Sequence, residues 1–443
     1  MVETGASGRS TFDRELEDAL VGVGLPSSTT GALTPLVEAG CSVGAWAASG
    51  AMALTGHADG PPLAPRPPVV TRLAAAARAV EAAAGREGAA LDVDPARLLT
   101  ARAAARGFGR QGRRSAGGRC WLLPAADGWV AVNLARPDDV PLLLGAGLGL
   151  DVNDGVDPVT ALAPTVAAWP AAALAARSQL LGLPVARLPA RVPPVTSPFA
   201  VGGRGASRRR RPGTPFVVLD LTAMWAGPLA AHLLAGCGAK VLSAEDPARP
   251  DAARLGDPAL YTELHEGHGH VALDLATAAG RRDLADLVAA ADVVIESSRP
   301  RALQQLGVDA RRVVAEGRGK TWVSITGYGR RGAAATNVAF GDDAAVAGGL
   351  VARDAGGDPV FCADAVADPI TGLYAALGAL ASLAAGGGHL VDVPMRRAVA
   401  YAARGQGCPR RHVVERDGGR WVVHHGDDRP VMVRDVVVDG VAP

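Results

Sequence analysis

From Phe216 onward, short apolar runs rich in β-branched residues alternate with stretches that carry apolar residues at helical spacing. The strand-like runs are FVVLDLT, AKVLSAE, ADVVIES and KTWVSITG, and the helical stretches include AGPLAAHLLAGCG, residues 280–291 and residues 308–316. Strands that alternate with helices predict a parallel sheet with right-handed crossovers. We therefore predict an α/β fold over residues 216–405, a doubly wound, Rossmann-like parallel sheet that binds ligands at the carboxyl ends of its strands.

The chain before this region has a different pattern. Ala-rich helical stretches lead to CWLLPAADGWVAVNLA, which has the apolar strands and the central turn of a β-hairpin, and helical spacing resumes over residues 159–181. This pattern predicts an α+β region over residues 1–186 with a small β-hairpin subdomain. A similar pattern, HVVERDGGRWVVHH, predicts a second hairpin in a short C-terminal segment, residues 406–443.

Residues 187–215 are rich in Pro, Gly, Ser and Arg and lack periodic apolar positions, which is typical of a linker. The basic run from Arg208 to Arg211 stands alone, and such runs in linkers are usually solvated. Over the whole chain, 45 lysines and arginines balance 44 acidic residues. This balance argues against a strongly basic nucleic-acid surface and favours a small-molecule partner.

Length and cysteine usage narrow the class of protein further. A chain of 443 residues exceeds the usual size of one domain. Its five cysteines are scattered and form no Cys-x-x-Cys pair, which favours reduced thiols over a disulfide framework or a zinc site. We therefore expect a cytoplasmic protein without a metal. The acidic start and the interrupted apolar stretches predict neither a secretion signal nor a membrane span.

Two stretches of the chain, residues 47–97 and 347–397, align when they are shifted by 300 positions. Thr71 then matches Thr371, and Asp92 matches Asp392. Internal repeats indicate duplication of a structural unit. We therefore predict a partial duplication in which residues 1–186 are a degenerate copy. Pro68 stands where the second copy has Asp368, so only one copy keeps the carboxylate.

Asp368 lies in ADPITGLYAALGAL, directly before a strongly helical run. An Asp followed by Pro at such a point is a common helix N-cap, and this purely structural role stays open. The amino end of a helix also stabilises a carboxylate anion, because its N–H groups are free and its dipole is positive there. Asp368 is therefore the leading candidate for a catalytic carboxylate.

Three other groups of polar or flexible residues are weaker candidates. The glycines of SITGYGRRG (residues 324–332) have the spacing of a dinucleotide fingerprint, but no strong helix follows, so we interpret this loop as a backbone-lined acyl or pantetheine site. Adjacent acids such as Asp342 and Asp343 more often cap or solvate a helix than act as bases. The histidines of HEGHGH (residues 265–270) lack a second ligand cluster, and we expect them in a solvated loop.

Over residues 216–397 these motifs resemble the class III CoA transferases, also called the CaiB/BaiF family. VVLDLTAMWAGPLAAHLLAGCGAKV resembles the opening strand, helix and second strand of that family, and HVALDLATAAGRRDLADLVAAADVVIESSRP resembles its next unit. SITGYGRRG resembles its Thr-Gly-Gly loop, and DPITGLYAALGALASLAAGGGHLVDVPM resembles the segment with its catalytic Asp. In the first half, WAASGAMALTGHADGPP and AADGWVAVNLA resemble the loop before that Asp and the hairpin of the small domain.

This resemblance implies a CoA transferase that moves CoA from an acyl-CoA to a carboxylic acid, without a tightly bound cofactor. Asp368 would attack the thioester to form an acyl-aspartyl anhydride, which CoA thiolate would convert to an aspartyl thioester. Arg299 would lie near the CoA nucleotide, and N–H groups around Gly348 and Gly349 would hold the oxyanion. The other implied contacts are Trp225, Ala226, Gly227, Gly327, Tyr328 and Gly329. The chain would act as an intramolecular pseudo-dimer or as half of a homodimer.

Two alternatives stay open. Related α-methylacyl-CoA racemases use a His-Asp pair where this chain has Gly341, Asp342 and Asp343, and proton transfer at the α-carbon needs two suitable bases. The family also commonly has an Asn-Arg-Gly-Lys type sequence where this chain has His265 to His268, so a basic CoA contact is missing. A racemase or isomerase is thus the second enzymatic interpretation, and a degenerate CoA-binding protein is the third interpretation.

Overall fold

The computed structural model describes residues 11–22, 41–145, 158–409, 411–425 and 429–436, and all structural statements refer to these residues. Within them, the largest sheet has seven strands in the order β4-β12-β9-β8-β5-β6-β7. Their bounds are β4 Ala200–Arg204, β5 Val217–Leu221, β6 Lys240–Glu245, β7 Gly269–Ala272, β8 Val293–Glu296, β9 Thr321–Thr326 and β12 His389–Pro394. All neighbours pair in parallel except the edge strand β4, which is antiparallel to β12. The predicted α/β fold with a large, mostly parallel sheet is confirmed.

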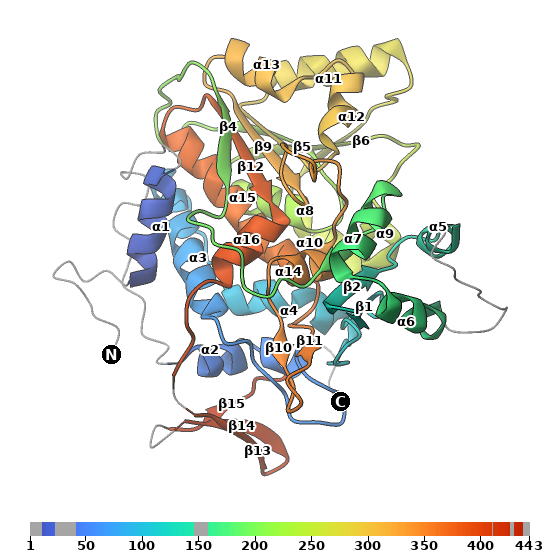
Figure 1. The fold of residues 1–443 in the computed structure, drawn as a ribbon. Helices are drawn as coiled ribbons and strands as arrows, with labels where there is room; N and C mark the ends of the chain where they lie inside the picture. Colours follow the sequence, from blue (N-terminus) through green and yellow to red (C-terminus); the bar gives the residue numbers. More distant parts are fainter. Residues whose placement is uncertain (1–10, 23–40, 146–157, 410, 426–428, 437–443) are drawn as a thin grey trace.

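Helices cover both faces of this sheet (Figure 1). On one face lie α8 (Ala226–Gly236) and α15 (Ala367–Ala384), and on the other lie α11 (Ala278–Ala290), α12 (Pro300–Gln305) and α13 (Ala310–Glu316). Alternate strand residues point to opposite faces, so Val293 packs in the core under α8 and α15 while Val294 packs in the core under α11 and α13. The central strands β8 and β9 are buried on both faces, which explains their continuous apolar sequences.

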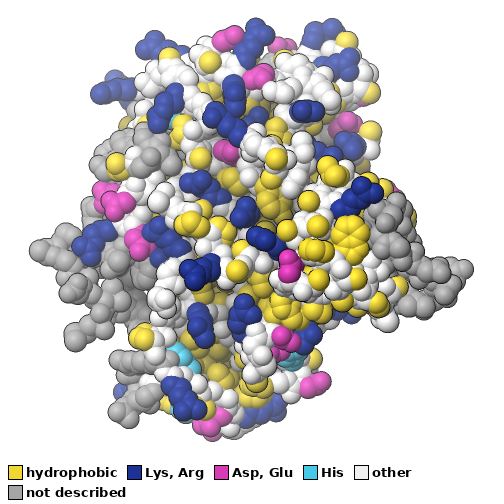
Figure 2. Space-filling model, in the orientation of Figure 1, with side chains coloured by type: hydrophobic (Ala, Val, Ile, Leu, Met, Phe, Trp, Pro, Cys, Tyr) yellow, Lys and Arg dark blue, Asp and Glu magenta, His cyan; other side chains and the backbone are white. Residues whose placement is uncertain are grey.

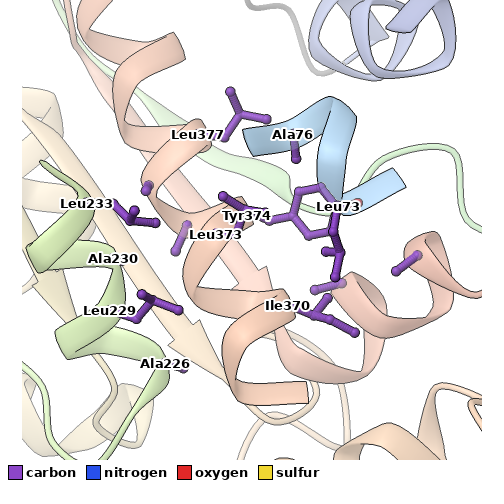
Figure 3. Close-up of a cluster of buried hydrophobic side chains, with 14 of the residues drawn as sticks. Leu73, Ala76, Ala226, Leu229, Ala230, Leu233, Ile370, Leu373, Tyr374 and Leu377 are labelled. Atoms are coloured by element: carbon purple, nitrogen blue, oxygen red, sulfur yellow. The ribbon is translucent and has the colours of Figure 1, made fainter. Parts of the chain in front are cut away.

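Part of the first half of the chain packs against this sheet layer and shares its core. Helix α3 (Val69–Arg86) lies along α15, and Leu73 and Ala76 of α3 meet Ile370 and Tyr374 of α15 (Figure 3). On its other side α15 contacts α8, so side chains from both halves belong to one hydrophobic cluster. Helix α4 (Pro95–Arg106) follows α3 and packs against it.

The predicted hairpin in the first half is present as β1 (Cys120–Ala125) and β2 (Gly128–Asn133), paired antiparallel. Strand β3 (Val185–Arg187) extends it on the β2 side. Helices α5 (Asp139–Gly145), α6 (Pro158–Ala168) and α7 (Ala171–Leu180) connect β2 to β3. Side chains of this sheet and its helices, including Val130, Leu162 and Leu174, form a hydrophobic cluster of their own.

The segment predicted as a linker, residues 187–215, is more ordered than its composition indicates. It contains β4, which closes one edge of the large sheet by pairing with β12. Arg208 is exposed, as expected for a solvated run, and pairs with Asp292 at 2.7 Å. Arg210 differs from that expectation, because its side chain is mostly buried and forms an ion pair with Glu87. These partners neutralise part of the basic run and anchor it to the fold.

The remaining elements surround the two sheets. The C-terminal hairpin is present as β13 (Val413–Asp417) and β14 (Arg420–His424), and β15 (Val431–Met432) pairs with β14. The other elements are α1 Thr11–Gly22, α2 Ser42–Ala48, a 3-10 turn at Ala51–Leu54, α9 Ala253–Gly256, α10 Pro258–Leu264, α14 Gly341–Ala347, β10 Ala352–Arg353, β11 Pro359–Val360 and α16 Met395–Ala402. On the face shown in Figure 2, basic side chains are more prominent than acidic ones, although the chain as a whole has balanced charge.

Helix α15 bears on two expectations from the sequence, the absence of a membrane span and the internal repeat. It is the one helix in the described residues that is long and apolar enough to cross a membrane, and 83% of that stretch is buried inside the fold. Helix α3, its counterpart in the proposed repeat, also has 18 residues and lies in contact with it. The duplication itself stays a prediction.

Candidate functional site

The candidate site is a cavity of about 320 Å³ at the carboxyl ends of the parallel strands. It lies where the strand order reverses, since β5 has β6 on one side and β8 on the other. Open parallel sheets bind ligands at this switch point. Its lining comes from segments that follow four strands, from the first turns of α8 and α15, and from one residue of the first half, Arg136.

Asp368 lines this cavity from the first turn of α15. The helix begins at Ala367 and its N-cap position is Val366, so Asp368 is not the cap that the sequence pattern allowed as an alternative. Its side chain is partly open toward the cavity and otherwise enclosed by protein. Gly341 lies so close that a β-carbon there would stand 2.2 Å from Oδ2 of Asp368. Asp368 thus presents a carboxylate to the cavity from a rigid helix end.

The electrostatic surroundings make Asp368 a weak acid. Burial raises the pKa of Asp368 to about 7, Arg102 lowers it, and the nearby carboxylates of Asp342 and Asp364 raise it further. A carboxylate in such a poorly solvated position is more reactive than one in water, because less hydration must be removed before it attacks. The perturbed pKa beside a cavity is typical of a functional group.

The first half of the chain supplies the cation that balances this group of acids. Arg102 of α4 forms a two-pronged ion pair with the fully buried Asp364, with both N–O distances at 2.7 Å. Although burial opposes its charge, the carboxylate of Asp364 raises the pKa of Arg102. The guanidinium also stacks over Trp225 at 5.3 Å from the ring centre. Arg102 is therefore fixed near Asp368 by two partners from the second half.

The loop that leads into α15 is strained. Ala363 and Ala365 have φ values of 53° and 42°, a left-handed conformation that costs on the order of 1–3 kcal/mol for a residue other than glycine. Two hydrogen bonds hold this conformation. The N–H of Ala363 donates to the hydroxyl of Thr55 at 3.1 Å, and the N–H of Ala365 donates to Asp342 at 2.9 Å. Both halves of the chain therefore fix the path of the backbone immediately before Asp368.

Asp342 and Asp343 have positioning roles in the first turn of α14. Burial, and next the charge of Asp364, raise the pKa of Asp342 to about 6, and its carboxylate accepts the N–H of Ala365. Burial raises the pKa of Asp343 well above its usual range. Asp343 accepts hydrogen bonds from the N–H of Phe340 and from the side chain of Asn133, each at 2.9 Å. The expectation that these acids are solvated is wrong, whereas capping by Asp343 is confirmed.

The amino end of α8 forms a second wall of the cavity. Ala226 and Gly227 line it, as the sequence implied, but Trp225 is buried against Arg102 and does not belong to the lining. Gly227 is required because a β-carbon there would lie 2.1 Å from the hydroxyl of Thr222. Gly372 of α15 lies against the backbone carbonyl of Ala226, where a β-carbon would be 2.7 Å away. This close helix contact brings the free N–H groups of α8 next to Asp368.

Of the other residues that the resemblance implied as CoA contacts, one lines the cavity and the rest pack against neighbouring elements. Gly327 lines the cavity. Tyr328 packs against a hydrophobic cluster that includes Cys120 and Leu122 of the first half. The N–H of Gly329 is bonded to Thr326, and Gly348 and Gly349 lie against Val399 and Val192. Among the implied contacts, Tyr328, Gly329, Gly348 and Gly349 thus support neighbouring elements and are outside the cavity lining.

Arg299 lines the cavity at the start of α12, and its exposed guanidinium lies near Gly182 of the first half. A second cavity of about 660 Å³ adjoins the first and shares Ala223, Ser297 and Ser298 with it. The second cavity extends along the ends of β5 and β6, where Arg249 is the basic residue of its lining. The two cavities together form an extended site suited to an elongated ligand.

The histidines of residues 265–270 differ from expectation. His265 and His268 are buried, at 8% and 9% exposure, so only part of this segment is a solvated loop. His265 stacks on Tyr261, and its Nδ1 lies 2.8 Å from the carbonyl of that residue. Burial lowers the pKa of His268 to about 4. These contacts stabilise the turn between α10 and β7 and lie outside the cavity lining.

Sequence reasoning missed the residues of the first half that reach the site. The side-chain amide of Gln179 forms hydrogen bonds to both backbone groups of Val338, at 2.8 and 2.9 Å, and thereby fixes one wall of the cavity. Arg136 lines the cavity and is held by Asp139 and by the carbonyl of Gly182. These partners are separated widely along the chain and have no motif of their own. After β5, Met224 has a φ of 73°, another strained position that only the folded structure reveals.

Comparison with known proteins identifies the second half. Residues 215–419 match the family model described as CoA-transferase family III. This part of the chain is therefore similar to that family. The matching region contains Asp368, both walls of the cavity formed by α8 and α15, and the strained loop before Asp368. The predicted resemblance is therefore confirmed.

Several known proteins are similar to part of this chain. Succinyl-CoA–D-citramalate CoA-transferase of Chloroflexus aurantiacus is 29% identical over 201 residues, which are 42% of this chain and 50% of that protein. A subunit of succinyl-CoA:(R)-benzylsuccinate CoA-transferase of Thauera aromatica is 33% identical over 205 residues, 42% of this chain and 49% of that protein. A crystal structure of a CaiB/BaiF family protein from Brucella suis has 26% identity and a TM-score of 0.39, and covers 42% of this chain and 53% of that chain. The chain thus spans about half the length of the curated relatives it matches.

Proposed function

We propose that this protein transfers CoA between an acyl-CoA thioester and a carboxylic acid, with Asp368 as the covalent nucleophile. One observation carries the proposal. Within the segment that is similar to CoA-transferase family III, Asp368 faces a cavity at the carboxyl ends of the sheet, and its pKa is raised to about 7. Relatives of this segment are named as CoA transferases that act on succinyl-CoA.

The proposed reaction proceeds by exchange at acyl carbons. A carboxylate oxygen of Asp368 attacks the thioester carbonyl, the C–S bond breaks, and CoA thiolate leaves an acyl-aspartyl anhydride. The thiolate then attacks the aspartyl carbonyl, which releases the donor acid and forms an aspartyl-CoA thioester. The acceptor carboxylate then attacks the aspartyl thioester, which forms a second anhydride and releases CoA thiolate. Attack of this thiolate on the acceptor's acyl carbon gives the new acyl-CoA and frees the carboxylate of Asp368. A carboxylate nucleophile suits this sequence because its anhydride is attackable from either side.

Helix ends and arginines supply the electrostatic stabilisation. The amino ends of α8 and α15 meet at the cavity, and N–H groups in the first turn of a helix have no partner within the helix. We assign oxyanion stabilisation to the N–H groups of Ala226 and Gly227, which line the cavity, in place of Gly348 and Gly349. Arg136 and Arg299 add positive charge to the same lining.

The two adjoining cavities suit the length of CoA. The pantetheine arm would occupy the cavity with Asp368, and the nucleotide would extend past Ser297 and Ser298 toward Arg249. This direction follows the rule that nucleotides bind across the switch point of the sheet. Arg249 and Arg299 would contact the phosphates, which partly replaces the basic contact absent at residues 265–268.

The first half would act as the partner subunit of an intramolecular pseudo-dimer. It supplies Arg102 to the acids around Asp368, Arg136 to the lining and Gln179 to the wall at Val338. All three residues belong to helices or loops that precede the family III segment. A single chain can therefore complete the cavity without a second copy.

Trapping of the covalent intermediate tests this function. The full chain is incubated with succinyl-CoA and then treated with hydroxylamine or borohydride, and the peptide that contains Asp368 is analysed by mass spectrometry. We expect a modified Asp368 in the wild type and none in Asp368→Asn, with at least 1,000-fold less transfer to dicarboxylic acids because the nucleophile is lost. The matched control is Asp358→Asn, a change at an acid on the surface that pairs with Arg113.

Two results would contradict the proposal. Exchange of the α-proton of an α-methylacyl-CoA in deuterated water, without an acceptor acid and without an Asp368 adduct, would indicate a racemase. Binding of CoA without any adduct on Asp368 would indicate a CoA-binding protein. Circular dichroism of Asp368→Asn must match the wild type, so that loss of the adduct reports chemistry and not folding.

A further inference from the structure

Outside the lining of the cavity with Asp368, three side chains of types that ligate metals come together from positions far apart in the sequence. The sulfur atoms of Cys41 and Cys408 and a ring nitrogen of His412 all lie within 4.8 Å of one another, and among the described residues this is the one such group. Cys41 Sγ and His412 Nε2 are 2.8 Å apart although 371 positions separate them in the sequence. The scattered spacing of the cysteines therefore concealed a spatial cluster.

A fourth ligand-type residue, His425, adjoins this group. Its ring centre lies 6.0 Å from that of His412, with the two rings at 68° to each other. His425 is buried at 6% exposure, directly after β14, and its Nε2 points to the start of α2, close to the point where a β-carbon on Gly44 would stand. Cys41 approaches the same point. His425 thus lies beside the group formed by Cys41, Cys408 and His412.

We propose that Cys41, Cys408, His412 and His425 form a structural zinc site. Two sulfur and two nitrogen ligands are the donor set of tetrahedral structural zinc. At Zn–S of about 2.3 Å and Zn–N of about 2.0 Å, such ligands lie about 3.3–3.8 Å apart. The separations among the first three ligand atoms, from 2.8 to within 4.8 Å, bracket this range, and the ring of His425 would move toward them to supply the fourth ligand.

The backbone around the cluster is fixed by contacts that do not involve the ligands. Cys41 has an extended conformation at the N-cap of α2. The hydroxyl of Ser42 accepts the N–H of Cys408 at 3.0 Å and donates to the carbonyl of Arg66 at 3.3 Å. The two cysteines are thus positioned by Ser42 before any metal binds.

A metal at this point would fasten the C-terminal sheet to the rest of the molecule. Strands β13, β14 and β15 form a small sheet that packs on α2, and both lie at the same end of the molecule in Figure 1. The sheet buries few apolar side chains, among them Val422 and Val423. So small a sheet is marginally stable by itself, and metals are a common means of stabilising such units. Zinc would join α2, the segment after α16 and the end of β14.

Metal analysis of the full chain tests the site. The protein is purified without chelators, and bound zinc is measured by elemental mass spectrometry. We expect about one zinc per chain, and at least a 10-fold lower occupancy in Cys41→Ser, Cys408→Ser, His412→Gln and His425→Gln. His424→Gln is the matched control, because His424 is the neighbour of His425 but pairs with Glu415 at 3.2 Å, and it should keep its zinc.

A second measurement keeps the test decisive if a variant folds poorly. In wild-type protein reconstituted with cobalt, thiolate-to-metal charge-transfer absorption is expected, and chelation should increase proteolysis within residues 403–412 without removing the Asp368 adduct. The proposal would be overturned if the purified protein contained no zinc and had a Cys41–Cys408 disulfide. It would also be overturned if the protein contained no zinc, had two titratable thiols and gave no cobalt spectrum. Zinc that is retained in both cysteine variants would overturn it as well. Asp368→Asn should bind zinc normally, so failure of the transferase proposal would be recognised separately.

Discussion

At the scale of single residues, burial and the charges around Asp368 together set its pKa. Burial and the nearby carboxylates favour its protonated form, whereas Arg102 favours the anion, and the resulting pKa is about 7. Arg102 is already paired with Asp364, so much of its charge is directed at that partner. Asp368 is therefore ionised only in part at neutral pH, and its ionised form meets little competing solvation.

This balance predicts an unusual pH dependence. Only the carboxylate attacks a thioester, and the folded protein holds Asp368 protonated below its raised pKa, so the rate of adduct formation should rise with pH. We expect about a 10-fold rise for each pH unit below 7 and a plateau above about 8. Single-turnover acylation by succinyl-CoA, measured from pH 5 to 9, checks this expectation.

The matched control in that experiment is Asp358→Asn, which should reproduce the wild-type profile because Asp358 has a partly exposed side chain and does not line the cavity. A rate that is already constant at pH 5 would contradict the raised pKa of Asp368. Such a result would mean that the carboxylate is better solvated than its surroundings indicate.

At the scale of secondary-structure elements, the contact between α8 and α15 places the proposed nucleophile beside the N–H groups proposed to stabilise the oxyanion. Gly372 allows α15 to approach the carbonyl of Ala226 and the side chain of Leu229. Figure 3 shows the two helices with Leu229 and Leu233 of α8 directed toward Leu373 of α15. The N–H groups assigned to the oxyanion and the nucleophile therefore depend on one close helix contact.

We predict that Gly372→Ala separates these helices. A β-carbon would lie 2.7 Å from the carbonyl of Ala226, and relief of this clash should lower the free energy of unfolding by about 1–3 kcal/mol. Adduct formation on Asp368 should fall by at least 10-fold, because small displacements in an active site have large effects on rate. Urea denaturation and single-turnover acylation measure the two effects.

Gly85→Ala in α3 is the control, since a β-carbon at Gly85 meets nothing within 4 Å. This variant should unfold at an equal or slightly higher urea concentration, because alanine favours a helix by up to about 1 kcal/mol over glycine. Equal behaviour of the two variants would show that the α8–α15 contact does not position the site.

The elements show why some of the fold was predictable from sequence. Strands β5, β6, β8 and β9 and helix α8 were predicted within one or two residues, because their signals are local apolar runs and glycine at a helix end. Strand β4, AVGGR, was interpreted as linker because glycines weaken its strand propensity. It forms because β12 offers it an edge, and that pairing is invisible in the local sequence.

At the scale of the whole molecule, the first half is part of the site and of the core. Asp368 and the cavity region were identified from local pattern and from family resemblance. Arg102, Asn133 and Gln179 were not, because their partners Asp364, Asp343 and Val338 are far away in the sequence. Contacts of this kind arise only when the chain folds, and they make the site dependent on both halves.

This arrangement predicts that the two halves unfold together. Leu73 of α3 packs against α15 in the shared cluster, and Leu73→Ala should lower the free energy of unfolding by about 2–5 kcal/mol. Hydrogen exchange should then accelerate in α15 and β5 as well as in α3, because one core holds all three. The control is Leu174→Ala, a buried leucine of the separate cluster around β1 to β3, which should accelerate exchange mainly within residues 120–187. Faster exchange that is confined to the first half in Leu73→Ala would contradict this prediction, because it would mean that the two halves are independently stable. The effect of Arg102 on the pKa of Asp368 would then arise from a contact between two domains and not from a shared core.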